Sequence, residues 1–189
     1  MRHVTRRARR ALPALALAAV VTVAGAPAQA ANTPGTGTAE TTDTSVATDQ
    51  AAATQLGGIA GWTAVAFFYT SLSTGETRLM ERAVTDDWED LPTHPGLGTG
   101  VPAAQRLVRE VRGVFPDLVE NITRVRRDGD RIEVSLLHCG THSAEFAGVP
   151  ATHKYVCFRG EETQTITGGR ISRTEHWEDI EGFLKEVGK

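Results

Sequence analysis

Two histidines in the sequence have the spacing of a zinc-binding pair on a helix. His138 and His142 are four residues apart, which places both imidazoles on one face of a helix. The residues before them, Ile132–Leu136, instead alternate between apolar and polar side chains, and Gly140 lies between the two histidines. This pattern predicts a strand, in which four residues span about 13 Å. We therefore expect no metal site at this pair, because one zinc ion holds its ligands at about 2 Å.

The sequence contains two cysteines, Cys139 and Cys157, and their positions favour a disulfide. Both lie after an N-terminal export signal, and an even number of cysteines in an oxidising compartment favours a bond. Each cysteine is nine residues from Gly148, so the two lie opposite each other if their strands pair symmetrically about that glycine. Two buried thiols are the alternative, because the sequence alone does not fix the register.

Residues 1–30 have the features of a cleavable signal peptide. Five arginines precede an apolar run over residues 11–26, and Ala28-Gln29-Ala30 offers small residues at both positions that a signal peptidase reads. A membrane anchor is the alternative, but Pro13 and Gly25 interrupt the run, which falls short of the roughly 20 residues of a span. We expect cleavage near Ala30, secretion, and no membrane span in the mature protein.

Residues 31–57 are predicted to form a disordered linker. The segment is rich in Ala and Thr and has almost no large apolar side chain, so it cannot bury enough surface to offset its ordering entropy. Loss of the five leader arginines takes the formal net charge of the chain from −3 to −8. Such an acidic protein is a poor match for nucleic acid or for an anionic membrane surface. We expect neither as a partner.

Residues 58–189 have the length of one folded domain. Apolar residues at helical spacing predict helices over residues 62–72, 76–84 and 102–115, with a loop rich in Pro and Gly over residues 90–100. Alternating patterns predict strands over residues 119–127, 131–141, 153–167 and 170–177, with Gly-containing hairpin turns inside the first and last pairs. Asp179 is expected to cap a last helix. This order predicts an α+β fold.

Several motifs in this domain resemble those of one known family. The most specific is Gly140-Thr141-His142, followed by Glu145-Phe146-Ala147-Gly148-Val149-Pro150. The pattern continues in Trp88-Glu89-Asp90, Phe115-Pro116-Asp117-Leu118, Gly169-Arg170-Ile171 and Glu175-His176-Trp177-Glu178-Asp179. Through these motifs the chain from Trp62 to Gly188 resembles the SnoaL-like polyketide cyclase (ester cyclase) family.

The resemblance implies a cone-shaped barrel of the nuclear-transport-factor-2-like superfamily. In this fold N-terminal helices pack on a curved antiparallel sheet around an apolar pocket, and a short C-terminal helix closes it. Family members with known activity close rings in polyketide esters by intramolecular aldol chemistry. They use no metal and no cofactor, and an aspartate serves as acid and base at the enolisable carbon.

Enolisation needs a base with a raised pKa, a donor for the developing enolate and a dry pocket. His142 matches the histidine of the family's Gly-Thr-His segment, so the resemblance makes it a candidate to donate to the enolate or to move a proton. The alternative is a histidine that only shapes the next loop. On the strand after the Gly-rich loop, where the family carries its aspartate, Tyr155–Arg159 has no carboxylate. Glu161 and Glu162 come later, and one of them must face inward in a regular strand, so both are candidate bases.

Six further residues are candidates for the pocket lining: Trp88, Asp90, Phe146, Tyr155, Glu175 and Trp177. Core packing is the alternative for the aromatic residues, and a solvated loop is the alternative for Asp90. Glu175 and Trp177 share one face of their strand, whereas His176 points the other way.

The sequence therefore predicts an exported ester cyclase homologue that acts on a small, apolar, polyketide-like carbonyl compound by cofactor-free acid/base enolisation. The alternative is a non-catalytic small-molecule-binding protein of the same fold, which the missing strand carboxylate and the export signal favour. A homodimer is expected only because proteins of this fold often form dimers.

Overall fold

The computed structural model describes the backbone of residues 44–189 and the side chains from Gly58 onward. The expected signal peptide and residues 31–43 lie outside the described residues, so export, cleavage near Ala30 and the division into leader, linker and domain stay predictions. Helix α1 (Thr44–Thr74) begins inside the segment 31–57 that we assigned to the linker. No helix in the described part is both long and apolar enough to cross a membrane.

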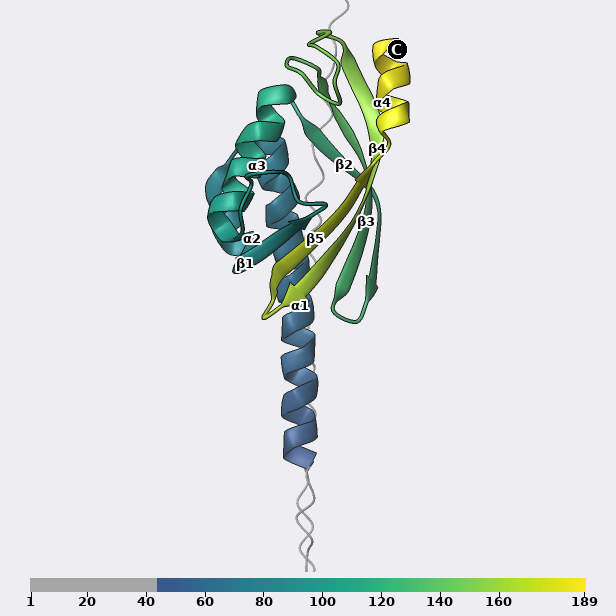
Figure 1. Cartoon of the computed structure of the whole chain (residues 1–189). Helices are drawn as coiled ribbons and strands as arrows, with labels where there is room; N and C mark the ends of the chain where they lie inside the picture. Colours follow the sequence, from purple (N-terminus) through teal and green to yellow (C-terminus); the bar gives the residue numbers. More distant parts are fainter. Residues whose placement is uncertain (1–43) are drawn as a thin grey trace, which may run out of the picture. The chain divides into compact units, whose positions relative to one another are not determined.

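A five-stranded sheet with the order β1-β5-β4-β3-β2 forms the body of the domain. Its long strands are β2 (Val119–Asp128), β3 (Arg131–Thr141), β4 (Tyr155–Thr167) and β5 (Arg170–Glu178). They pair antiparallel in sequence order, with the expected hairpins at Gly129 and at Gly168-Gly169. The strands curve strongly (Figure 1), but the edge strands β1 and β2 do not pair with each other within the described chain. The predicted α+β fold is confirmed, with an open, curled sheet in place of a closed barrel.

Strand β1 (Val84–Leu91) is the element that the sequence did not predict. We expected a helix over residues 76–84, but the chain forms only a 3-10 turn, η1 (Thr77–Leu79), and the short helix α2 (Met80–Ala83). It then runs parallel to β5, so the sheet is mixed rather than purely antiparallel. The apolar alternation that indicates a strand is weak here, because Thr85, Asp86 and Asp87 are three consecutive polar residues. All three stay at least partly exposed, as an edge strand allows.

Helices α1 and α3 (Gly100–Val114) lie on the same side of the curved sheet (Figure 1). Helix α1 buries Phe68, Tyr69 and Leu72 in the core and ends at Gly75, whose φ of 79° is in the left-handed region that favours glycine. Helix α4 (Ile180–Val187) begins where predicted, because the Asp179 carboxylate accepts a hydrogen bond from the backbone N–H of Gly182.

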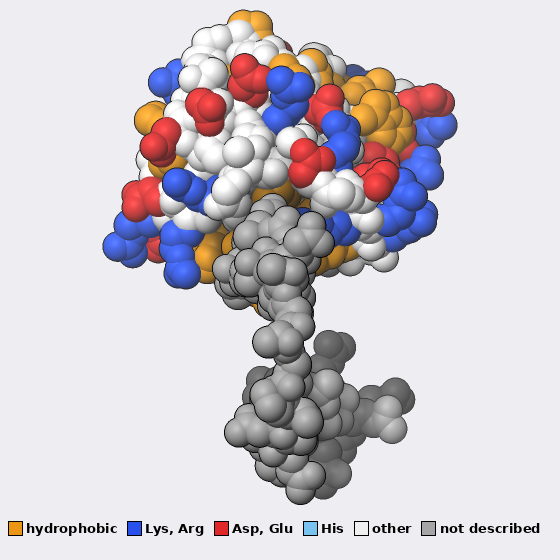
Figure 2. Space-filling view, turned by 90° about the horizontal axis from the view of Figure 1, so that it is seen from below, with side chains coloured by type: hydrophobic (Ala, Val, Ile, Leu, Met, Phe, Trp, Pro, Cys, Tyr) orange, Lys and Arg blue, Asp and Glu red, His pale blue; other side chains and the backbone are white. Residues whose placement is uncertain are grey.

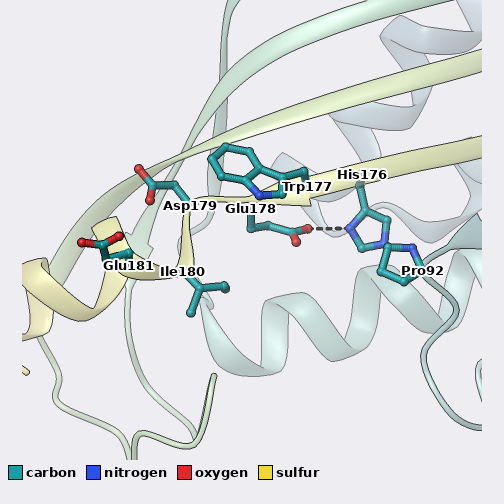
Figure 3. Close-up of a pocket in the computed structure, with 7 residues that line it drawn as sticks. All are labelled: Pro92, His176, Trp177, Glu178, Asp179, Ile180 and Glu181. Atoms are coloured by element: carbon teal, nitrogen blue, oxygen red, sulfur yellow. Dashed lines mark hydrogen bonds and ion pairs between the residues drawn. The ribbon is translucent and has the colours of Figure 1, made fainter.

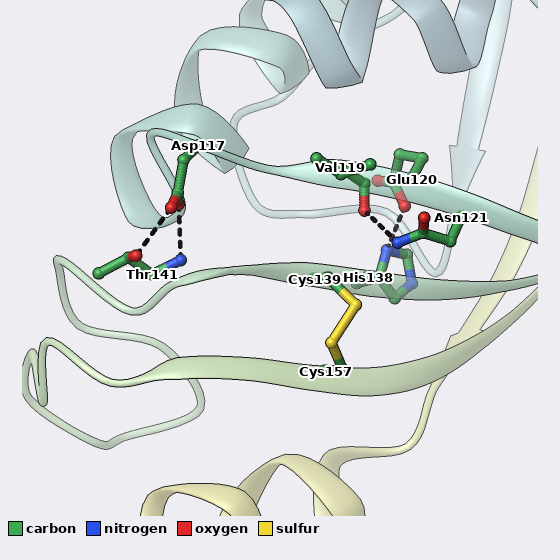
Figure 4. Close-up of a disulfide and its surroundings, with 8 residues drawn as sticks. All are labelled: Asp117, Val119, Glu120, Asn121, His138, Cys139, Thr141 and Cys157. Carbon is green, nitrogen blue, oxygen red and sulfur yellow. Dashed lines mark hydrogen bonds and ion pairs between the residues drawn. A yellow bond between two sulfur atoms is a disulfide. The ribbon is translucent and has the colours of Figure 1, made fainter. Parts of the chain in front are cut away.

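The predicted disulfide is present between β3 and β4 (Figure 4). Cys139 and Cys157 are direct partners in the strand register, with Cα atoms 4.2 Å apart, so the symmetric register about Gly148 is confirmed. At the same end of β3, the Asp117 carboxylate accepts hydrogen bonds from the backbone N–H and the hydroxyl of Thr141 (Figure 4). The two contacts fix the end of the sheet that leads into the Gly-Val-Pro loop.

Removing this disulfide should lower stability without changing the fold. The bond joins residues with a sequence separation of 18, and restricting a loop of that size in the unfolded chain stabilises a protein by about 3 kcal/mol. We expect the double variant Cys139→Ala, Cys157→Ala to lose about that much free energy of unfolding in urea denaturation. Protein isolated from the culture medium should contain no free thiol under denaturing conditions. Two free thiols would contradict the bond.

Candidate active site

A cavity of about 670 Å³ lies between α1, α3, the loop after β1 and the inner face of the sheet. This volume is within the range of small-molecule sites. Most of its wall is apolar, and the large apolar side chains that line it are Phe68, Leu72, Leu107, Val111, Val114, Phe115, Leu118, Phe146, Phe158 and Ile180. An apolar wall lowers the local dielectric and so strengthens polar interactions inside the cavity.

The Glu162 carboxylate is one of the buried acidic groups that line this cavity. Its side chain faces inward from β4, and the residue is 8% exposed. The Tyr69 hydroxyl and the Gln164 amide each donate a hydrogen bond of 2.8 Å to Oε2. Among the described residues no other group donates to this carboxylate, so Oε1 remains free to act. Burial is the main cause that raises the pKa of Glu162 to about 7, and the nearby negative charge of Glu120 is the second cause.

A buried hydrogen-bond chain holds Gln164 in the orientation that serves Glu162. The Thr174 hydroxyl donates to Oε1 of Gln164 at 2.7 Å, and the Trp88 indole N–H donates to the Thr174 hydroxyl at 2.9 Å. Because the Gln164 carbonyl already accepts from Thr174, its amide N–H group must point to Glu162. Burial raises the pKa of Tyr69 well above its usual value, so this side chain stays a hydroxyl donor.

His138 and Glu120 form a second polar pair on the cavity wall. Nδ1 of His138 lies 2.9 Å from Oε2 of Glu120 (Figure 4). Burial lowers the pKa of His138, but the hydrogen bond and charge of Glu120 outweigh it and raise the pKa overall. The ring lies against the backbone of Gly160, where any Cβ would collide with Nε2. Nδ1 of His138 is thus paired with Glu120, and buried Nε2 has no hydrogen-bond partner among the described residues.

A third group of polar side chains stands near the loop that follows β1. Nε2 of His176 is 3.6 Å from Oδ2 of Asp90, and Nδ1 donates a hydrogen bond of 2.7 Å to Glu178 (Figure 3). Burial alone would lower the pKa of His176, but Glu178 and then Asp90 raise it to about 9. Burial raises the pKa of Asp90 to about 6. The His94 ring lies parallel to that of His176, with the ring centres 5.9 Å apart.

Acidic side chains outnumber basic ones on the cavity wall, where the basic groups are His94, His138 and His176. Of the described residues that line it, none is Lys or Arg, whereas six are acidic: Asp90, Glu110, Glu120, Glu145, Glu162 and Glu178. Acidic and basic side chains are interspersed on the face of the domain that Figure 2 shows. The cavity therefore disfavours an anionic ligand and accommodates a neutral or cationic one.

The structure separates the three predicted catalytic residues. One of the two neighbouring glutamates was expected to face inward, and it is Glu162. Glu161 lies on the outer face, where its carboxylate accepts from the Ser135 hydroxyl at 2.7 Å. His142 is fully buried beyond the end of the cavity, with Nδ1 3.0 Å from the Thr152 hydroxyl, and it is not among the cavity-lining residues. The expected meeting of His142 with a carboxylate in one cavity does not occur.

Of the predicted pocket residues, Asp90 and Phe146 line the cavity. Trp88 is buried behind it as part of the hydrogen-bond chain to Gln164. The other three are outside: Tyr155 is 60% exposed, Trp177 is 54% exposed and lines only a shallow outer hollow (Figure 3), and Glu175 pairs with Arg131 on the outer face. Their strand alternation was predicted correctly, but the face that turns inward is the opposite one.

The sequence did not point to most of the polar groups at this site: Glu120, His138, Thr174 and His176 line the cavity, and Tyr69 and Gln164 donate to Glu162. A signal was available for those on β3 and β4. His138 is in phase with the apolar Val134 and Leu136, and Gln164 is in phase with Phe158 and Ile166, so period-2 alternation points them to the core face.

The raised pKa of Glu162 predicts how stability depends on pH. The groups facing this carboxylate are Tyr69 from α1, Glu120 from β2, His138 from β3 and His176 from β5. Since the folded pKa of about 7 exceeds the usual 4.5, the folded state holds a proton that the unfolded chain has lost, and this stabilisation disappears as pH rises through 7. Glu162→Gln should therefore gain stability relative to wild type between pH 5 and 8, by up to about 3 kcal/mol.

Chemical denaturation of the wild type and the Glu162→Gln variant at several pH values measures this difference. Glu161→Gln, on the exposed face of the same strand, is the matched control. If the free energy of unfolding depends on pH in the same way in wild type and in Glu162→Gln, then Glu162 has the same pKa in the folded and unfolded chains. That result would contradict the prediction.

Known proteins give this arrangement a context. A model of the SnoaL-like polyketide cyclase family matches residues 63–187. Nogalonic acid methyl ester cyclase of Streptomyces nogalater is 27% identical over 124 residues, which cover 63% of this chain and 90% of that protein.

Solved structures agree on the fold. TsrD from Streptomyces laurentii superimposes with a TM-score of 0.63 at 15% identity, over 69% of this chain and 96% of that one. A Catenulispora acidiphila protein with a ketosteroid isomerase-like fold gives a TM-score of 0.54 at 13% identity, over 66% and 92% of the two chains. The predicted nuclear-transport-factor-2-like fold is confirmed, and the chain belongs to the SnoaL-like polyketide cyclase family.

Proposed function

We propose that this protein catalyses ring closure in a neutral polyketide-type ester by acid/base enolisation, with Glu162 as the base. The observation that carries the proposal is a buried carboxylate with one free oxygen on the wall of a largely apolar cavity. Its pKa of about 7 suits a base that must take up and return a proton near neutral pH.

In the proposed reaction the carbon between two carbonyl groups gives its proton to Oε1 of Glu162. The electron pair left on that carbon attacks a second carbonyl carbon of the same molecule and forms the new C–C bond. The oxygen of the attacked carbonyl becomes an alkoxide, which takes the proton back from Glu162. The carboxylate is thereby regenerated at the end of the cycle. His138, held by Glu120, is the proposed donor to the negative oxygen in place of His142.

The charge of the cavity supports a neutral ester rather than a free acid as substrate. Six acidic side chains line it, without Lys or Arg among the described lining residues. A substrate carboxylate would be repelled, and a methyl ester would not. The name of the Streptomyces nogalater relative specifies a methyl ester as the substrate of that protein, which agrees with this reasoning.

A non-catalytic role in binding a neutral small molecule is the second candidate. The specific observation in its favour is that Tyr69 and Gln164 both donate to Glu162, because hydrogen bonds to the ionised form weaken a base. Binding without any exchange at the acidic carbon would identify this role.

The base role predicts catalysed hydrogen–deuterium exchange at the acidic carbon of a methyl β-keto ester in D₂O. NMR should show a faster rate with the protein than without it. Glu162→Gln should lower the catalysed rate by about 100-fold or more, in the range that general-base catalysis contributes.

Glu161→Gln is the matched control, because its carboxylate lies on the outer face of the same strand and its loss should leave the rate unchanged. His142→Ala should also retain exchange if the protein folds. Equal rates for wild type and Glu162→Gln would remove Glu162 from the mechanism.

We also propose that the domain acts outside the cytoplasm, on the support of the leader-like residues 1–30. Intact-mass measurement of protein from the culture medium should give a chain that begins at Ala31. A full-length chain retained inside the cell would contradict export.

A further inference from the structure

The loop after β1 brings two histidines and a carboxylate together at the edge of the cavity. Ligand atoms of Asp90, His94 and His176 all lie within 4.8 Å of one another. The three come from the end of β1, the following loop and the end of β5, and all three line the cavity. From this geometry we propose that Asp90, His94 and His176 bind a divalent first-row transition-metal ion such as Zn²⁺.

His176 is already arranged as a metal ligand would be. Its side chain is 9% exposed, and buried Nε2 has no hydrogen-bond partner among the described residues. Nδ1 donates to Glu178 at 2.7 Å (Figure 3). A metal-binding histidine usually donates its other ring N–H to a carboxylate in this way, which fixes the ring, and Nε2 would bind the ion after it loses its proton.

The other two ligands differ in how firmly they are held. Asp90 is 3% exposed and its Oδ2 is 3.6 Å from Nε2 of His176. This distance is close to the roughly 3.4 Å between neighbouring ligands in a tetrahedral site with metal bonds of about 2.1 Å. His94 lies in an exposed loop, so it can close the remaining distance by a small shift.

The surroundings favour a cation of this kind. The acidic lining of the cavity contributes negative charge, with no Lys or Arg among its described members to oppose a metal. Two imidazoles and one carboxylate suit Zn²⁺ or Fe²⁺ rather than Mg²⁺ or Ca²⁺, which prefer oxygen ligands. Three protein ligands leave further coordination positions free, as in catalytic metal sites.

Isothermal titration of the full chain, without a polyhistidine tag, with Zn²⁺ tests the site. We expect one ion per chain and no comparable binding of Mg²⁺. His94→Ala should weaken Zn²⁺ binding by about 100-fold or more, since loss of a ligand costs more than the 10- to 100-fold of an outer partner. Because His94 is exposed, this variant should fold, and circular dichroism checks that it does. Asp90→Asn should weaken binding in the same way.

His153→Ala is the matched control, since His153 is also exposed but does not line the cavity. It should bind Zn²⁺ like wild type. Glu178→Gln should weaken binding by about 10- to 100-fold without changing the stoichiometry, as expected for a positioning residue. Equal affinities for wild type and His94→Ala, or no stoichiometric binding to wild type, would overturn the site. Deuterium exchange by metal-free protein remains a separate test of Glu162.

Discussion

A carboxylate removed from water must be paired, hydrogen-bonded or protonated, and Glu162 places this constraint on the whole domain. Tyr69 on α1 and Gln164 on β4 supply its two hydrogen bonds, and Thr174 on β5 and Trp88 on β1 hold Gln164 in place. Four elements thus converge on one acid. The curvature of the sheet, which lets α1 reach β4 across its inner face, is the feature that makes this possible.

The fold was largely predictable because its strands carry local signals. Glycine turns at Gly129 and at Gly168-Gly169 predicted the hairpins, and the alternation over Ile132–Leu136 predicted β3. The register that joins Cys139 to Cys157 also followed from symmetry about one glycine. Strand β1 was not predictable in this way, because its partner is distant in sequence and its acidic middle has no apolar alternation.

The site was predictable only in part. Alternation of side chains along a strand shows which residues share a face of the sheet, but it does not show which face turns toward the cavity. That ambiguity put Glu175 and Trp177 in the pocket instead of Thr174 and His176. His142 carried the family motif, yet it lies past the end of the cavity, where it packs against Phe183. Contacts between residues far apart in sequence, such as that of Tyr69 with Glu162, leave no local signal.

Glu162 is proposed to be a base with a raised pKa that faces a cavity for neutral ligands. Carbon-13 NMR of the Glu162 carboxyl, titrated with and without a neutral β-keto ester, tests it most directly. We expect a midpoint near pH 7 in the free protein, and a shift of the signal on adding the ester but not the corresponding acid. A midpoint near the ordinary value of 4.5, unaffected by either compound, would contradict it.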